Sequence, residues 1–244
     1  MIFALFLTTL AASTTIIGGI FGTLIKKDNP KITSLALSFS AGVMICLSLF
    51  EIIPKSINHF NKLGYSFLYS LLFFTIGALL VLFIHKLAKK NENKLQKIGI
   101  ISFILLTIHN FPEGMATFSI VMESKEFSWP LILAIAIHNF PEGLLISFPI
   151  FLIEKNRKKA IIMTVVSALA EPIGGFFGYY LFKIVFSNLS LGVIFSLISG
   201  IMIFLSIFQL LPEAHFIGGK KSTFYGTIIG SLFMTLSLIA LNFS

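Results

Sequence analysis

The chain has 244 residues, of which 56% are hydrophobic and only 11% are charged, and its 28 phenylalanines outnumber its 18 lysines and arginines. This composition is typical of a membrane protein and argues against a soluble domain. The formal net charge of +8 does not indicate nucleic-acid binding, because the basic residues lie between long apolar runs, where they set membrane topology.

Eight apolar runs follow one another, each long enough to cross a bilayer as a helix of about 20 residues. They cover residues 2–25, 32–53, 65–88, 98–121, 129–153, 160–182, 190–211 and 222–243. A signal peptide would have basic residues before its apolar run. No Lys or Arg precedes the first run, so we keep it as a transmembrane helix. We therefore predict an all-α, polytopic membrane protein with eight transmembrane helices in a single domain over residues 1–244.

The basic residues between these runs predict the orientation. If the N-terminus lies outside, 14 of the 18 lysines and arginines fall on the cytoplasmic side. These are Lys26, Lys27, Lys31, Lys86, Lys89, Lys90, Lys94, Lys97, Lys155, Arg157, Lys158, Lys159, Lys220 and Lys221, whereas Lys55, Lys62, Lys125 and Lys183 fall outside. By the positive-inside rule, both termini are predicted on the extracytoplasmic side.

Two parts of the chain repeat one another. Residues 41–54 match residues 199–212 at a constant spacing of 158, with Gly, Met, Ile, Leu, Ser, Phe and Pro recurring identically. An odd number of crossings separates the two copies, so they must cross the membrane in opposite directions. Halves 1–88 and 160–244 are thus expected to flank central helices 98–153 in a 3+2+3 inverted repeat, an arrangement that places the binding site of many transporters near the midplane. In this alignment Thr15 corresponds to Glu171.

The hexapeptide His-Asn-Phe-Pro-Glu-Gly occurs at residues 109–114 and again at 138–143, both times inside an apolar run. Residues three and four apart share a helix face, so His109 and Glu113 point the same way. Glu171 brings a third acid to the middle of its own run. Intramembrane carboxylates each cost about 2.5–3.5 kcal/mol, and a divalent cation is the simplest partner. Imidazole and carboxylate ligands together suit Zn²⁺, Fe²⁺, Mn²⁺, Co²⁺ or Cd²⁺.

Pro112 and Pro141 cannot donate a helical hydrogen bond, so a kink or an unwound turn is expected in each copy, with the freed carbonyls close to the ligands. Glu51 lies toward the outer end of the second run and is read either as part of an entrance vestibule or as an exposed interfacial acid. The sequence contains no ATP-binding motif of the Gly-x-x-x-x-Gly-Lys-Ser/Thr kind, so an ion gradient is expected to drive any transport.

Two other functions compete with metal transport. A membrane di-metal enzyme would also place carboxylates and histidines on a bundle, but its usual Glu-x-x-His spacing differs from the His-to-Glu spacing found here. A proton-coupled carrier of an organic solute would need a pocket for a carbon skeleton. Metal-dependent flux separates transport from both alternatives.

The doubled hexapeptide and the segment Ala-Glu-Pro-Ile-Gly-Gly at residues 170–175 resemble the ZIP (Zrt-, Irt-like protein) family of divalent metal transporters, in particular its bacterial ZupT/GufA-like branch. The resemblance extends over all eight runs. The loop between the third and fourth runs is short and contains Lys and Asn instead of the long histidine-rich loop of many eukaryotic members, so a cytoplasmic metal-sensing loop is not expected.

The resemblance implies a two-metal site. Its first position would use His109, Glu113, His138 and Glu142, with Met44 as a further ligand; its second would use Asn110, Glu113, Asn139, Glu142 and Glu171. The chain would then be a transporter of the cell inner membrane, with zinc as the first expected substrate, without catalytic residues and without a cofactor other than the transported metal. Its expected partners are divalent metal ions and membrane lipids but not nucleic acid, and a homodimer is left open.

Overall fold

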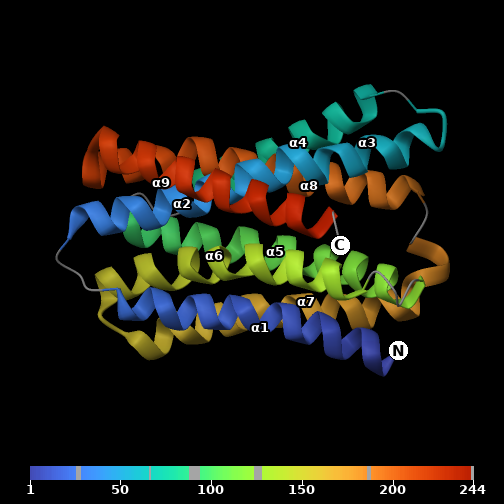
Figure 1. Cartoon of the computed structure of the whole chain (residues 1–244), viewed down its shortest axis with the longest axis horizontal. Helices are drawn as coiled ribbons and strands as arrows, with labels where there is room; N and C mark the ends of the chain where they lie inside the picture. Colours follow the sequence, from blue (N-terminus) through green and yellow to red (C-terminus); the bar gives the residue numbers. More distant parts are fainter. Residues whose placement is uncertain (26–28, 66, 88–93, 124–127, 186–187, 243–244) are drawn as a thin grey trace.

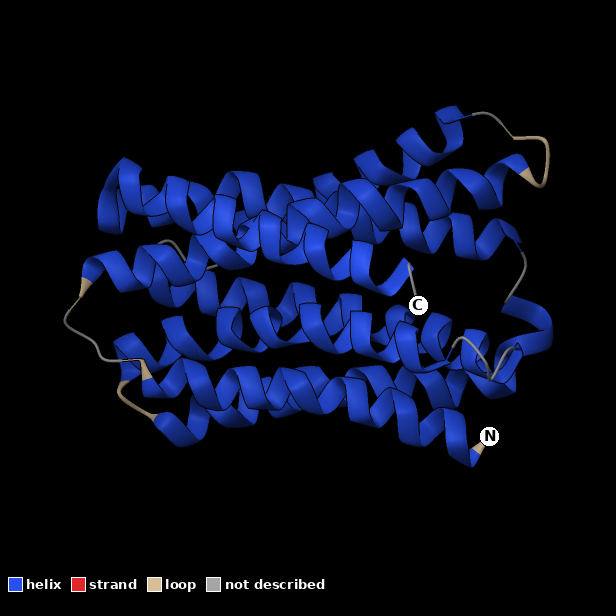
Figure 2. Cartoon of the chain, in the orientation of Figure 1, coloured by secondary structure: helices blue, strands red, loops and turns tan. Residues whose placement is uncertain are grey.

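The computed structural model describes residues 1–25, 29–65, 67–87, 94–123, 128–185 and 188–242, and all secondary structure in these ranges is helical (Figure 1) (Figure 2). The elements are α1 (Ile2–Leu24), α2 (Pro30–Leu47), η1 (Ser48–Ile52), α3 (Ile53–Asn61), α4 (Phe67–Leu87), α5 (Lys94–Glu123), α6 (Ser128–Glu154), α7 (Arg157–Val185), α8 (Asn188–Leu205), η2 (Ser206–Leu210) and α9 (Leu211–Asn242). Helices satisfy their own backbone hydrogen bonds, as a bilayer interior requires. The all-α prediction is confirmed for the described residues.

Among the described residues, seven helical segments are long and apolar enough to cross a membrane, where the sequence predicts eight. The difference lies in the last segment, Leu189–Ala240, which is continuously helical over 52 residues and joins α8, η2 and α9. A straight helix of this length would span about 78 Å, more than twice the roughly 30 Å of a bilayer core. The segment is not straight, because Gly219 inside it has φ 80° and ψ 170°, a backbone conformation outside the helical region.

The chain reverses direction at Gly219, as contacts with α2, η1 and α3 show. In the part before Gly219, the contact partners run in the opposite direction to the first segment: Ser48 contacts Met202, whereas the later Ser56 contacts the earlier Ser196. In the part after Gly219, the contact partners run in the same direction as α2: Ser34 contacts Thr223, and the later Cys46 contacts the later Thr235. The part before Gly219 is therefore antiparallel to α2, and the part after it is parallel to α2.

Close helix crossings recur in matching places. Gly18 in α1 faces the carbonyl of Phe140 in α6, and its counterpart Gly174 in α7 faces the carbonyl of Phe111 in α5; a Cβ at either glycine would overlap the carbonyl oxygen. Three further contacts between a glycine and a backbone carbonyl have a counterpart in the other half. Gly143 against Thr15 matches Gly114 against Glu171; Gly42 against Thr227 matches Gly200 against Phe74; and Gly230 against Phe39 matches Gly77 against Leu197. Small residues let membrane helices approach this closely.

Two π-helical turns also match. They are η1 and η2, and each ends two residues before a proline, Pro54 or Pro212. A proline lacks the N–H that the carbonyl four residues earlier would accept and its ring crowds that carbonyl, so a wider turn relieves the clash. In contrast, α5 and α6 continue through Pro112 and Pro141, and the unwound turns expected there are absent from these two described helices. The unwound turn was therefore the wrong alternative, whereas a kink at either proline stays a prediction.

The helices form layers that enclose the motif-bearing pair. α5 and α6 lie in the middle, with α1 and α7 on one side and α2, α8 and α9 on the other (Figure 1). Leu37, Met44, Leu105 and Leu145 are among the completely buried residues of the core between these layers. Many large apolar side chains instead point outward, Ile2 and Phe216 with about three quarters of their surface exposed, as expected for a lipid-facing surface. The two hexapeptides thus lie deep in the bundle.

Candidate metal centre

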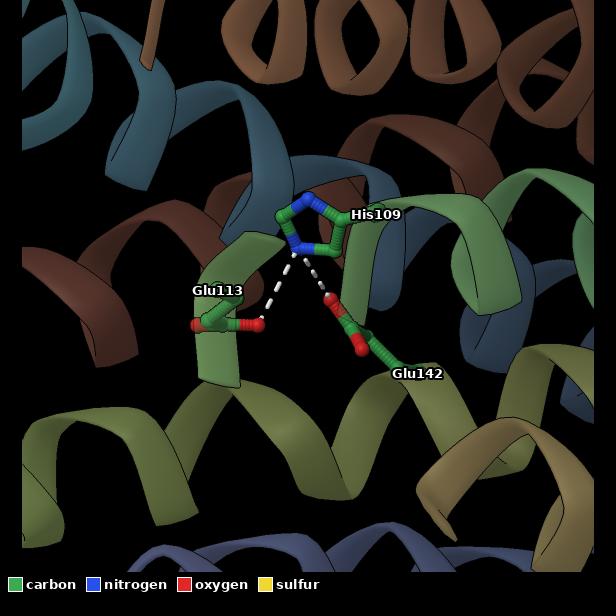
Figure 3. A group of neighbouring side chains, drawn as sticks. All are labelled: His109, Glu113 and Glu142. Atoms are coloured by element: carbon green, nitrogen blue, oxygen red, sulfur yellow. Dashed lines mark ion pairs between the residues drawn. The ribbon is translucent and has the colours of Figure 1, made fainter. Parts of the chain in front are cut away.

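Four side chains from the two hexapeptides converge between α5 and α6. The Nε2 atom of His109 lies 3.3 Å from a carboxylate oxygen of Glu113 and 3.4 Å from one of Glu142, and its ring points between the two acids (Figure 3). The other oxygen of Glu113 lies 2.6 Å from Nε2 of His138. Glu113 therefore joins both histidines, because α5 and α6 are antiparallel and bring each motif against the other.

One ligand atom from each of His109, Glu113 and Glu142 can be chosen so that all three lie within 4.8 Å of one another. His109 is 2% exposed and Glu142 is completely buried. Neither ring nitrogen of His109 and neither carboxylate oxygen of Glu142 has a hydrogen-bond partner in the protein. Buried polar groups without partners are costly, and a bound cation would satisfy them. Mixed nitrogen and oxygen donors suit a borderline dication such as Zn²⁺.

A second polar group adjoins the first on the side of α7. The Asn139 side-chain amide donates a hydrogen bond of 2.8 Å to Glu171, and the Asn110 amide donates one of 3.2 Å to the backbone carbonyl of Ser167. One oxygen of Glu171 and both asparagine side-chain oxygens remain without a partner. Glu171 also lies close enough to interact electrostatically with Glu113 and Glu142, so three carboxyl groups share one buried region.

Close helix contacts at two glycines position the carboxylates of the centre. Gly114 directly follows Glu113 and packs against the backbone carbonyl of Glu171, and Gly143 directly follows Glu142 and packs against that of Thr15. Each carboxylate is thus fixed beside a crossing where no Cβ fits. The glycine that ends each hexapeptide therefore positions the acid before it.

A cavity of about 520 Å³ reaches this centre; we call it the site cavity. Its polar lining consists of Glu51, Lys55, His109, Glu113, Thr117 and His138. The remaining lining is apolar and comes from α2, η1, α6 and α8. Of the two sequence interpretations of Glu51, the cavity supports the vestibule. Sequence reasoning missed Lys55 and Thr117, although both lie one helical turn from a residue that it had singled out.

The predicted ligands are only partly brought together. His109, Glu113, His138 and Glu142 form one contiguous group, while Asn139 and Glu171 contact each other, and Asn110 bonds to α7. Met44 is completely buried in the core formed by α2 and its neighbours and is not part of the site cavity's lining.

Comparisons with known proteins agree on one family. The sequence model of the ZIP zinc transporter family matches residues 86–238. The zinc transporter ZupT of Chlorobaculum parvum is 37% identical to this chain, covering 98% of the chain and 97% of its own length. The ZupT of Streptococcus mutans is 38% identical, covering 97% and 96%, and that of Xanthomonas axonopodis is 35% identical, covering 99% and 95%. The chain therefore belongs to the ZIP family of zinc transporters, which move divalent metals across membranes, use no cofactor and are not enzymes.

Proposed function

We propose that this chain carries Zn²⁺, and with it Fe²⁺, Mn²⁺, Co²⁺ and Cd²⁺, into the cytoplasm through a two-metal centre between α5, α6 and α7. One observation carries the proposal: His109, Glu113 and Glu142 offer ligand atoms within 4.8 Å of one another in a buried setting. A cation there would relieve both the missing hydrogen bonds and the repulsion between the carboxylates.

The two positions share their acids. The first would be formed by His109, Glu113, His138 and Glu142, to which Met44 would add a thioether. The second would be formed by Asn110, Asn139 and Glu171 together with Glu113 and Glu142. Support for the bridging role comes from Glu113, whose two oxygens face different histidines, and from the electrostatic interaction of both bridging acids with Glu171. Metal binding at the second position would replace the hydrogen bond between Asn139 and Glu171.

We further propose one transmembrane domain over residues 1–244 with eight crossings, in which halves 1–88 and 160–244 flank central helices 98–153 as a 3+2+3 inverted repeat. The matched glycine crossings, the matched π-helical turns and the reversal at Gly219 support this arrangement. The reversal divides the segment Leu189–Ala240 into the seventh and eighth crossings.

The termini are proposed to face away from the cytoplasm, in the inner membrane of the cell. The start of α1 and the end of α9 lie toward one end of the bundle, and the end of α1 and the turn between α6 and α7 lie at the other, as an even number of crossings would place them (Figure 1). At the second end, Lys31 in the first turn of α2, Lys155 between α6 and α7, and Lys159 in the first turn of α7 are exposed. Lys26, Lys27, Lys89, Lys90 and Lys125, which also entered the topology prediction, lie outside the described residues. A negative-inside potential would then favour uptake of a dication by about 4.6 kcal/mol per 100 mV.

The outward apolar side chains support contact with membrane lipids, and a homodimer remains a prediction. Family membership sets aside the membrane di-metal enzyme. A carrier of an organic solute is disfavoured by the cavity, which ends at two histidines and an acid rather than at an apolar pocket.

Metal uptake into proteoliposomes tests the proposed function. The purified chain is reconstituted, a negative-inside potential is imposed, and uptake of Zn²⁺, Cd²⁺, Mn²⁺, Co²⁺, Fe²⁺ and Mg²⁺ is measured against protein-free vesicles. We expect saturable Zn²⁺ uptake that increases with the potential, and little Mg²⁺ uptake. Absence of metal flux from a folded, reconstituted chain would refute the proposal.

A further inference from the structure

We propose that Glu51 is an additional metal-binding position at the mouth of the site cavity, and that the Lys55 ammonium group occupies it as an internal competing cation until a dication displaces it. This inference rests on the proposed transport function and deepens it. It assigns a divalent-cation ligand outside the two-metal centre, together with a device that controls its occupancy.

The two residues form a close ion pair. Lys55 Nζ lies 2.6 Å from one Glu51 carboxylate oxygen, and the two side chains are 44% and 22% exposed. The second oxygen of Glu51 is buried and has no hydrogen-bond partner. One oxygen of the carboxylate is therefore held by the ammonium group, while the other faces the protein interior with its lone pairs unused.

The pair shares a cavity with the metal centre. Glu51 and Lys55 line the site cavity together with His109, Glu113 and His138. His109, at the inner end of the same cavity, is almost completely buried and has no hydrogen-bond partner at either ring nitrogen. A cation at Glu51 would therefore share this cavity with unsatisfied ligand atoms.

The same pair also lines a second cavity. It has an empty volume of about 860 Å³ and is lined by Phe50, Glu51, Pro54 and Lys55 and by Thr235, Leu238 and Ile239 of α9. Glu51 and Lys55 belong to the walls of both cavities. Displacement of Lys55 would therefore change the lining of both cavities.

The setting distinguishes this pair from an ordinary surface ion pair. Glu154 and Lys159 form a comparable contact of 2.8 Å with exposures of 18% and 50%, but they lie at the turn between α6 and α7 and outside the lining of the site cavity. Glu51 lies in the π-helical turn η1, and such turns occur frequently at functional sites.

The repeat gives a further contrast. At the positions that match Glu51 and Lys55, the second half has Gln209 and Glu213, an amide and an acid. The second half therefore does not repeat the acid followed four residues later by a lysine. Competition between a monovalent ammonium and a dication for one carboxylate lets a metal bind by displacement, whereas a monovalent ion gains little over the lysine.

Paired substitutions test the inference. Glu51→Gln removes the ligand charge at constant shape, and Lys55→Met removes the competing charge while keeping the alkyl chain. In Zn²⁺ uptake, the half-saturating concentration should rise about tenfold in Glu51→Gln, which corresponds to roughly 1.4 kcal/mol. It should fall about threefold in Lys55→Met, the size expected for a partly exposed charge pair. Lys55→Met should have no effect in the Glu51→Gln background, because Lys55 then has no ligand to occupy.

The matched controls are Glu154→Gln and Lys159→Met, which should leave the half-saturating concentration unchanged. Equilibrium binding of Zn²⁺ to the purified variants gives a readout independent of flux and should shift in the same opposite directions. The inference is overturned if the half-saturating concentration shifts in the same direction in Glu51→Gln and Lys55→Met. It is also overturned if Lys55→Met has the same effect in the wild-type and Glu51→Gln backgrounds, because Lys55 would then act by long-range repulsion of the metal. Wild-type metal flux without these shifts refutes this inference alone, whereas loss of all metal flux in the wild type refutes the proposed function.

Discussion

Replacing Glu113 with glutamine should weaken metal binding more than any other single isosteric change in the centre. The side chain faces His138 at 2.6 Å and His109 at 3.3 Å and interacts electrostatically with Glu171, so it contributes to both proposed metal positions. Two unit charges 4 Å apart interact by about 4 kcal/mol at an effective dielectric constant of 20. A dication doubles this attraction, and the amide dipole and reorganisation of the site recover part of it. A net loss of about 4 kcal/mol corresponds to roughly 1,000-fold weaker binding.

Zn²⁺ binding to the purified variant by calorimetry, and uptake by the reconstituted variant, measure this effect. Glutamine keeps the volume of the side chain and can still hydrogen-bond to a histidine, so circular dichroism and thermal unfolding should stay close to wild type. Glu154→Gln serves as the control, because it neutralises a carboxylate outside the site cavity. Binding within about tenfold of wild type, with an unchanged metal stoichiometry, would refute a carboxylate that bridges two metals.

The remaining predictions concern topology, selectivity and stoichiometry. In a Cys46→Ala background, a cysteine at Asn156 should be shielded from an impermeant thiol reagent in intact cells and one at Asn61 should be labelled; the reverse pattern would invert the proposed orientation. Equimolar Cd²⁺ should inhibit Zn²⁺ uptake strongly and Mg²⁺ only weakly, because Mg²⁺ prefers oxygen ligands and keeps its waters, and equal inhibition would contradict a histidine-containing site. Glu171→Thr gives the second half the hydroxyl that Thr15 supplies in the first, so about one metal per chain should bind while slower uptake persists; an unchanged stoichiometry would remove Glu171 from the metal site.

Much of the fold could be predicted from sequence because a bilayer leaves few choices. Long apolar runs must be helical there, and their ends follow from composition, so α1 and α4 begin and end within two residues of the predicted runs. The doubled hexapeptide also led directly to four converging side chains, since the i,i+4 spacing fixes which of them share a helix face. Antiparallel packing of α5 and α6 then brings His138 to Glu113.

Other features depend on contacts that no local pattern contains. The prolines at 112 and 141 were expected to kink or unwind their helices, yet α5 and α6 are continuous, whereas π turns precede Pro54 and Pro212. The partner of Asn110 could not be predicted either, because the amide reaches a backbone carbonyl on another helix, and backbone groups are equally available all along a sequence. Lys55 entered the sequence interpretation only as one basic residue among many, although its i,i+4 spacing from Glu51 was already visible.

The candidate metal centre lies beside two matching helix crossings, and the residues at these crossings differ between the two halves. Gly114 against Glu171 and Gly143 against Thr15 are equivalent crossings, so the backbone brings an acid to one of them and a hydroxyl to the other. A fully symmetric chain would have either four mutually repelling acids or too few ligands for a second cation, because each half would carry the same residue at this position. One extra carboxylate on one side would allow two metals to share Glu113 and Glu142. Farther out, the first half has an acid followed four residues later by a lysine, at Glu51 and Lys55, and the matching positions of the second half do not repeat this pair. The proposed repeat would let the chain open in two directions, and its exceptions would determine what a metal meets in each.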